Sequence, residues 1–226
     1  MLSHRGDLRR TAERLRAGGT LRVLALGSST TAGVGASSIE RAYPERLEAE
    51  LSALVPGARV EVEASGVSGE TADRTLDRIR REAAGAQPDL VVWQVGTNDA
   101  LTVGAGEEAF RATLAGGVAA VRGVGADLLL LDQQFFPGIV DRARYERFVA
   151  LVKETGRASG VSVVHRYALM KAWSERSREE LRTLLWTDLF HMSDPGHACV
   201  ARLIAEHVAA AAREAEPVVV RSAVGP

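Results

Sequence analysis

Three short turns carry the side chains best suited to chemistry in this 226-residue chain. Ser29 follows an apolar run at residues 23–26 and lies in a turn rich in glycine and hydroxyl residues. Gly69 lies in a turn after the alternating segment at residues 60–62, and Asn98 lies in a turn after the apolar run at residues 90–95. A serine that attacks a carbonyl group generates an oxyanion, which needs hydrogen-bond donors already in place. The N–H groups of Ser29 and Gly69 and the side-chain amide of Asn98 can supply three such donors.

The general base that a serine nucleophile needs is predicted near the C-terminus. Two Asp-x-x-His pairs follow each other there, Asp188 with His191 and Asp194 with His197. The first pair precedes Ser193, a typical N-cap residue, so we place it in the loop before the last predicted helix. The second pair falls in the first turn of that helix, where the aspartate complements the helix dipole and the histidine faces solvent or packs. We therefore predict the first pair as catalytic base and orienting carboxylate.

Two other interpretations of these motifs stay open. The four aspartates and histidines near the C-terminus recur every third residue, as metal ligands can, but Pro195 and Gly196 disfavour the continuous helix that would gather them. The turn at residues 27–33 resembles a phosphate-binding loop, but no Gly-Lys-Ser/Thr follows it. The chain also lacks a Gly-x-Ser-x-Gly elbow, which disfavours the other common serine-hydrolase fold. We expect acyl chemistry that needs no metal and no cofactor.

Apolar runs and helical periodicities alternate along the chain and predict the elements that position these turns. The predicted strands cover residues 23–26, 60–62, 90–95, 126–131 and 161–164, and the clearest helices cover 43–54, 107–122, 141–158 and 195–212. Residues 167–185 predict one or two more helices. This alternation predicts an α/β fold with a parallel five-stranded sheet in three α/β/α layers. Because parallel strands end at a common edge, Ser29, Gly69 and Asn98 should converge there.

Composition points to one globular domain. With 46% hydrophobic residues, the chain is long enough for a single core at about residues 21–212, preceded by a helix at 7–17 and followed by a tail at 213–226. A net charge of −1 gives no reason to expect a nucleic-acid partner. A single cysteine excludes an internal disulfide and a cysteine-based zinc site. No apolar run reaches the roughly 20 residues of a membrane helix. We expect a soluble protein without a signal peptide in the chain as given, either cytoplasmic or exported after loss of a leader.

The order of these motifs resembles the SGNH or GDSL-type hydrolases. Residues 27–33, with Ser29, are similar to the family's Gly-Asp-Ser-Leu nucleophile block, although Ser28 stands where the family usually has aspartate. Residues 67–71 and 96–99 look like its glycine and asparagine blocks, and residues 188–191 look like its terminal Asp-x-x-His block. The resemblance spans residues 21 to about 200. It implies a flavodoxin-like fold and a serine esterase that uses no metal.

The predicted substrate is a small-molecule or carbohydrate ester. Gln134 and Phe135 follow the fourth predicted strand, so they can line the acyl or alcohol pocket or pack beneath the next helix. Short loops without an inserted lid favour an open site for small acyl groups, including those on acetylated sugars. A lysophospholipase, thioesterase or acyltransferase using the same site remains an alternative, as does a catalytically silent carbohydrate-binding or interaction protein of the same fold. The oligomeric state is not predicted.

Overall fold

The computed structural model describes residues 3–4 and 6–214, and its centre is a twisted sheet. Five parallel strands lie in the order β3-β2-β4-β5-β6, and β1 adds an antiparallel strand beside β6. The strands are β1 (Ser3–His4), β2 (Thr20–Gly27), β3 (Arg59–Gly66), β4 (Leu90–Gln94), β5 (Asp127–Leu131) and β6 (Ser162–Val164). The order of the parallel strands is that of a flavodoxin-like sheet, which confirms the predicted architecture. The two-residue edge strand β1 was not predicted.

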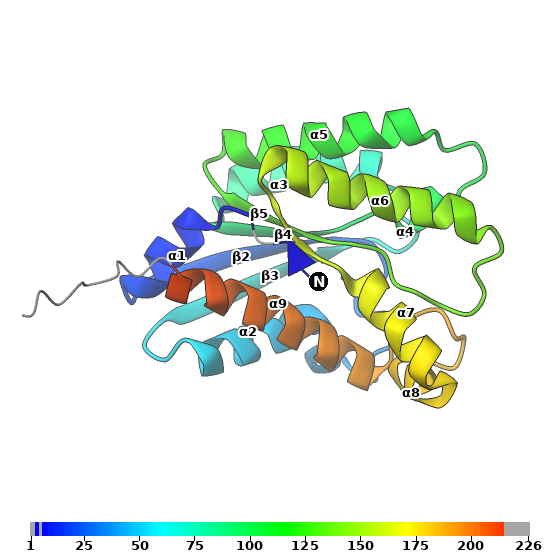
Figure 1. Cartoon of the computed structure of the whole chain (residues 1–226). Helices are drawn as coiled ribbons and strands as arrows, with labels where there is room; N and C mark the ends of the chain where they lie inside the picture. The colour runs from blue at the N-terminus through cyan, green and yellow to red at the C-terminus, as the bar shows by residue number, and fades with distance from the viewer. Residues whose placement is uncertain (1–2, 5, 215–226) are drawn as a thin grey trace, which may run out of the picture.

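Helices cover both faces of this sheet (Figure 1). One face carries α3 (Ala72–Ala86), α5 (Glu107–Gly123) and α6 (Arg142–Ser159), and the other carries α2 (Tyr43–Leu54) and α9 (Asp194–Glu214), with α1 (Arg9–Arg16) packed on α9. The segment predicted as one or two helices forms two, α7 (Arg166–Arg176) and α8 (Arg178–Leu184). Ser177 separates them because its side chain accepts a hydrogen bond from the Glu180 N–H, as an N-cap does. The predicted C-terminal tail lies outside the described residues after Glu214.

The core lies where the central strands meet the helices on each face. All five residues of β4 are buried, which explains why this strand is an unbroken apolar run ending in glutamine rather than an alternating pattern. The Trp93 indole is fully buried, and it packs directly against Gly117 of α5. A side chain at position 117 would overlap the indole ring, so the absence of a Cβ lets α5 approach the sheet closely.

Gly117→Ala is expected to destabilise the fold even though alanine favours helices. The new methyl group would overlap the Trp93 ring, and overpacking of this kind costs about 1–3 kcal/mol. Gly85→Ala is the matched control, because Gly85 also lies in a helix but has no heavy atom near its would-be Cβ. The control should gain about 0.5–1 kcal/mol from helix propensity. Urea unfolding of both variants tests this, and equal stabilities would contradict the close packing at Trp93.

Buried Asp89 anchors α1 at the N-terminal ends of the strands. Its carboxylate accepts hydrogen bonds from the Nε atoms of Arg10 (2.8 Å) and Arg14 (3.0 Å) and from the Arg22 N–H (3.1 Å). Burial raises the pKa of Asp89, but the Arg22 hydrogen bond and the two arginines lower it by more, so its pKa lies below the ordinary value. This cluster therefore ties the first helix to β2 and β4.

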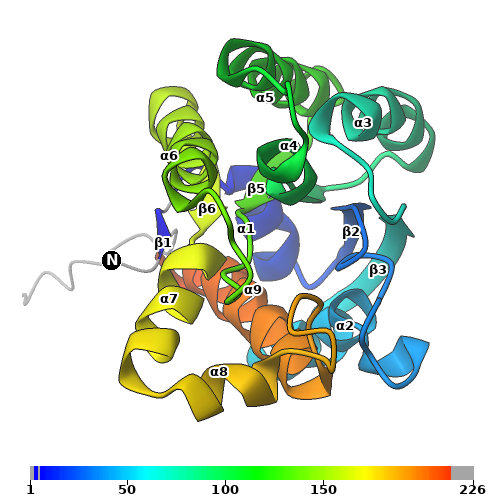
Figure 2. The ribbon, with the colours of Figure 1, turned by 90° about the vertical axis from the view of Figure 1, so that its right-hand side faces the viewer.

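The opposite edge of the sheet holds the turns that carry the predicted site. Figure 2 views the molecule from this end, where β2 and β3 finish and where α4 (Thr97–Leu101) and the loop before α9 lie. The remaining element, a 3₁₀ turn at Ile39–Arg41, precedes α2. No helix among residues 6–214 is both long and apolar enough to cross a bilayer.

Candidate active site

Ser29 lies in the turn directly after β2 and is almost buried, with 7% of its surface exposed. Gly27 is the last residue of β2. A Cβ at this position would overlap the side chains of Thr31 and Gln94, so the position requires glycine. The Gln94 Oε1 atom accepts hydrogen bonds from the N–H (2.9 Å) and hydroxyl (3.1 Å) of Ser28. Gln94, at the end of β4, therefore holds the turn through Ser28. Ser28 is the residue that stands where GDSL-type hydrolases usually have aspartate.

Gly69 lies in the turn after β3, whereas Asn98, predicted in a turn, lies in the first turn of helix α4. The two segments are hydrogen-bonded to each other. Gly69 has φ of +78° in a turn closed by the Glu70 N–H on the Val67 carbonyl, a conformation that favours glycine. The Asn98 Nδ2 atom donates to the Glu70 carbonyl at 2.8 Å. This bond uses one amide hydrogen and orients the other, so it fixes the amide relative to the glycine turn.

Arg78 is a positioning residue that sequence reasoning missed. Its buried guanidinium donates to the Gly27 carbonyl (2.9 Å), to the Ser65 carbonyl (3.0 Å) and to the Glu70 carboxylate (2.6 Å). It therefore joins the ends of β2 and β3 to the turn that contains Gly69. The sequence gives no clear signal for this role, because the residues three and four positions away in α3 include Arg74, Arg81 and Glu82.

Asp188 and His191 form a hydrogen-bonded pair in the loop before α9. The His191 Nδ1 atom lies 2.6 Å from the Asp188 Oδ2 atom, and Asp188 Oδ1 accepts from the N–H groups of Phe190 (2.9 Å) and His191 (3.0 Å). Burial raises the pKa of Asp188, but the hydrogen bonds from His191 and Phe190 lower it below the ordinary value. The aspartate is therefore ionised at neutral pH and pairs with His191 Nδ1, which leaves the Nε2 atom outside this hydrogen bond.

Gly35 brings the Ser29 turn and the His191 loop into contact. The Val34 N–H donates to the Ser29 carbonyl at 2.9 Å, so the residues that follow the serine fold back over it. A Cβ on Gly35 would overlap the Met192 carbonyl and lie 3.2 Å from the His191 Cβ atom. The chain segments after the predicted nucleophile and around the predicted base are therefore packed together, although they are far apart in the sequence.

The second Asp-x-x-His pair, Asp194 and His197, holds the segment that follows the Ser29 turn. Asp194 accepts hydrogen bonds from the N–H (2.8 Å) and hydroxyl (2.6 Å) of Ser37. His197 is fully buried; its Nδ1 accepts from the Tyr43 N–H and its Nε2 donates to the Val34 carbonyl, each at 3.2 Å. Of the two expectations for His197, packing is therefore correct and solvent exposure is wrong.

The possible metal ligands point to different partners. Asp188 pairs with His191, whereas Asp194 binds Ser37 and His197 binds backbone groups. Within the part of the chain that the structure describes, no three histidine, cysteine, aspartate or glutamate side chains gather as metal ligands would. The three-residue spacing of these aspartates and histidines therefore does not bring them together around one metal position.

An apolar cleft of about 640 Å³ opens beside Asp188. Its walls come from the end of α4, the loop after β5 and the loop that carries the Asp–His pair. It is lined by Leu101, Phe136, Pro137, Gly138, Asp188, Leu189 and Phe190. The Phe136 and Phe190 rings meet edge to face, with centroids 4.8 Å apart.

Gln134 and Phe135, the predicted pocket residues, lie beneath this cleft. The Gln134 Nε2 atom donates to the Phe190 carbonyl at 3.2 Å, and its backbone carbonyl accepts from the Tyr145 hydroxyl at 2.8 Å. Phe135 is buried and packs its ring against Tyr167. Both residues support the loops around the cleft, while the lining aromatic side chain is that of the next residue, Phe136.

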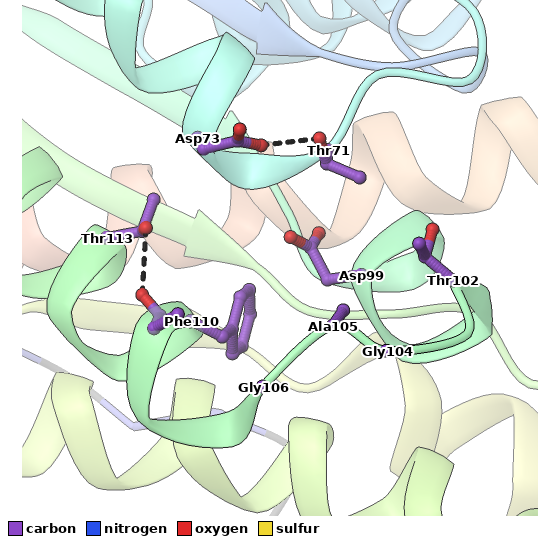
Figure 3. Close-up of a pocket in the computed structure, with 10 residues that line it drawn as sticks. Thr71, Asp73, Asp99, Thr102, Gly104, Ala105, Gly106, Phe110 and Thr113 are labelled. Atoms are coloured by element: carbon purple, nitrogen blue, oxygen red, sulfur yellow. Dashed lines mark hydrogen bonds between the residues drawn. The ribbon is translucent and has the colours of Figure 1, made fainter.

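A second, more polar pocket of about 360 Å³ lies between α3, α4 and α5 (Figure 3). Asp99 projects into the region between the start of α3 and α4, where its carboxylate accepts from the Ala72 N–H at 3.0 Å. Burial raises the pKa of Asp99 to about 6, nearby Asp73 adds to the rise, and the Ala72 hydrogen bond opposes it. Asp99 therefore caps α3 as a carboxylate that is costly to ionise.

Asp99→Asn is expected to stabilise the protein at pH 7 but not at pH 4. With a pKa raised to about 6, folded Asp99 holds its proton where the unfolded chain has lost it, so wild-type stability falls as the pH rises from about 4 to 6. Asparagine can accept the same Ala72 N–H bond without that penalty. The gain at pH 7 should be about 3 kcal/mol. Thermal unfolding at both pH values measures this gain. An equal loss of stability in the variant at both pH values would show that the Asp99 carboxylate stabilises the fold.

The sheet order and the helical layers on both faces define a fold of the SGNH-hydrolase type. The family model described as "Non-GDSL lipase-like family" matches residues 1–214, and the chain belongs to this family. Comparison with curated proteins gives no match. The family name agrees with the serine and threonine that flank Ser29 in place of the aspartate and leucine of a GDSL block.

Solved structures share this fold. A two-domain esterase (CEX) active on acetylated mannans is 24% identical, with a TM-score of 0.75 over 94% of this chain and 56% of that one. A lipase/acylhydrolase from Enterococcus faecalis is 22% identical, with a TM-score of 0.72 over 84% of this chain and 96% of that one. An acetyl xylan esterase, AlAXEase, is 18% identical, with a TM-score of 0.71 over 81% of this chain and 98% of that one. This chain spans little more than half of the two-domain esterase.

Proposed function

We propose that this protein is a serine esterase with Ser29 as nucleophile, His191 as general base and Asp188 as the carboxylate that orients the base. The observation that carries the proposal is the packing of the Ser29 turn, through Gly35, against the loop in which His191 pairs with Asp188. The family match over residues 1–214 supports the same activity. Ser29 N–H, Gly69 N–H and Asn98 Nδ2 are the proposed oxyanion donors.

In the proposed reaction His191 Nε2 takes the proton of the Ser29 hydroxyl as Oγ attacks the ester carbonyl. The carbonyl oxygen becomes an oxyanion, and the three donors stabilise it. The tetrahedral intermediate then collapses: the bond to the alcohol oxygen breaks, and imidazolium returns the proton to that alcohol. Water attacks the acyl-enzyme by the same steps and releases the carboxylic acid. Asp188 stays ionised throughout and stabilises the imidazolium, consistent with its lowered pKa.

We propose esters of short acyl groups as substrates, including acetyl groups on carbohydrates. Support comes from structural neighbours that act on acetylated mannans and from an acetyl xylan esterase of the same fold. The apolar cleft beside Asp188 favours a second candidate, the hydrolysis of lipid-like esters with longer acyl chains. The two candidates use the same catalytic groups and differ in how much of the substrate enters that cleft.

Two measurements test the proposal. A fluorophosphonate probe should label the native protein at Ser29, as read by mass spectrometry of the labelled peptide, and heat-denatured protein should stay unlabelled. Absence of labelling would contradict the proposal and favour a catalytically silent binding protein. Nitrophenyl esters from acetate to decanoate then separate the substrate candidates. An optimum at acetate supports the short-acyl assignment, whereas an optimum at six or more carbons replaces it with the lipid-like one.

A further inference from the structure

Arg166 is a buried cation at the first position of α7. Its side chain is 1% exposed, and within residues 6–214 no carboxylate oxygen forms an ion pair with its guanidinium. One guanidinium nitrogen, Nη2, has no hydrogen-bond partner among the described residues. Burying a charge without a paired carboxylate costs several kcal/mol, so its surroundings must offset that cost or make use of the charge.

The contacts of Arg166 join the two segments on which the proposed chemistry depends. Its Nη1 atom lies 3.4 Å from the Thr30 hydroxyl and 3.5 Å from the Met192 sulfur. Thr30 directly follows Ser29, and Met192 directly follows His191. One planar group therefore touches the neighbour of the nucleophile and the neighbour of the base.

The end of β5 fixes the guanidinium from the other side. The Arg166 Nε atom donates to the Asp132 carbonyl at 3.1 Å. The Asp132 side chain is itself held, because it accepts from the Tyr167 N–H at 2.9 Å and lies 3.2 Å from His165 Nδ1. Arg166 therefore bridges from a rigid strand end to both loops.

Four titratable groups from other elements interact electrostatically with this guanidinium. Asp132, Tyr145 and Tyr43 favour its charged form, while burial lowers the pKa of Arg166. Burial also lowers the pKa of His197, and the positive charge of Arg166 lowers it further. Asp132 is therefore the one carboxylate among these four groups.

We propose that Arg166 is a positioning residue that holds the Ser29 turn and the His191 loop in register. This inference rests on the proposed serine-esterase function. Small displacements between nucleophile and base cost rate rather than substrate affinity, so its loss should lower kcat with little change in KM.

Two substitutions separate geometry from charge. Arg166→Lys keeps the charge but cannot reach Asp132, Thr30 and Met192 together, so kcat should fall about tenfold with little change in KM. Arg166→Met removes both the charge and the hydrogen bonds, so kcat should fall about 10²-fold, again with little change in KM. Nitrophenyl acetate hydrolysis over a range of substrate concentrations gives kcat and KM for both variants.

Arg14→Met is the control, because it removes an arginine from the Asp89 cluster at the far edge of the sheet. It should lower the unfolding temperature and leave kcat and KM unchanged. The inference is overturned if the Arg166 variants are folded and keep wild-type kcat, or if Arg14→Met lowers kcat as much as Arg166→Met does. Either result leaves the esterase assignment intact if Ser29→Ala is inactive, so the two proposals fail separately.

Discussion

Ser29→Ala should abolish ester hydrolysis while leaving the fold unchanged. Without the hydroxyl no acyl-enzyme can form, and loss of the nucleophile in a related triad costs on the order of 10⁶-fold in kcat. The side chain makes no hydrogen bond that the turn needs, since the turn is held through the Ser29 carbonyl and through Ser28. Hydrolysis of nitrophenyl acetate under saturating conditions is the direct measurement, with thermal unfolding run on the same sample.

Ser28→Ala is the matched control for this substitution. It removes a hydroxyl one residue away, together with its 3.1 Å hydrogen bond to Gln94, and should cost about 1 kcal/mol of stability. Its activity should stay within an order of magnitude of wild type. If Ser29→Ala retained most of its activity, or if Ser28→Ala were the inactive variant, the nucleophile assignment would be wrong.

Asp188→Asn should lower kcat by about 10⁴-fold with little change in the fold. The amide can present an N–H rather than an acceptor to the ring, which favours the tautomer with its proton on Nε2 and leaves imidazolium without a counter-charge. In the wild type, a 2.6 Å contact to His191 Nδ1 specifies the productive tautomer. The measurement is kcat for nitrophenyl acetate at pH 8.

Asp194→Asn tests whether the choice between the two Asp-x-x-His pairs is correct. Asp194 binds Ser37 in the segment that follows the Ser29 turn, and an asparagine at position 194 can still accept the hydrogen bond from the Ser37 N–H. We expect a small loss of stability and a far smaller loss of kcat than for Asp188→Asn. Equal losses of activity in the two variants would contradict the assignment of Asp188 as the orienting carboxylate.

The parallel sheet was predictable because most of its strands contain a short apolar run, and β3 an alternating segment, followed by glycine or polar residues. β4 illustrates this, since burial on both faces makes it apolar almost throughout and a turn follows at Gly96. The same rule predicts that Ser29, Gly69 and Asn98 share an edge. Strand β1 was not predictable, because two residues paired to β6 leave no periodicity to detect.

The supporting residues of the site were less accessible from sequence. Arg78 and Arg166 look like ordinary charged helix positions, and only tertiary packing shows that their guanidinium groups turn inward. The identity of the lining aromatic also depends on how the chain turns after β5, which determines whether Phe135 or Phe136 faces the cleft. His197 was ambiguous because the first turn of a helix can face either solvent or a neighbouring loop.

The Asp89 cluster places a main anchor of α1 at the end of the sheet opposite the candidate active site. Such a division separates the residues that hold the chain together from those that contact a substrate. Random mutagenesis confined to the cleft walls, at Leu101 and Leu189 for example, should therefore yield a high fraction of folded variants. The scaffold is suited to laboratory evolution of new ester preferences.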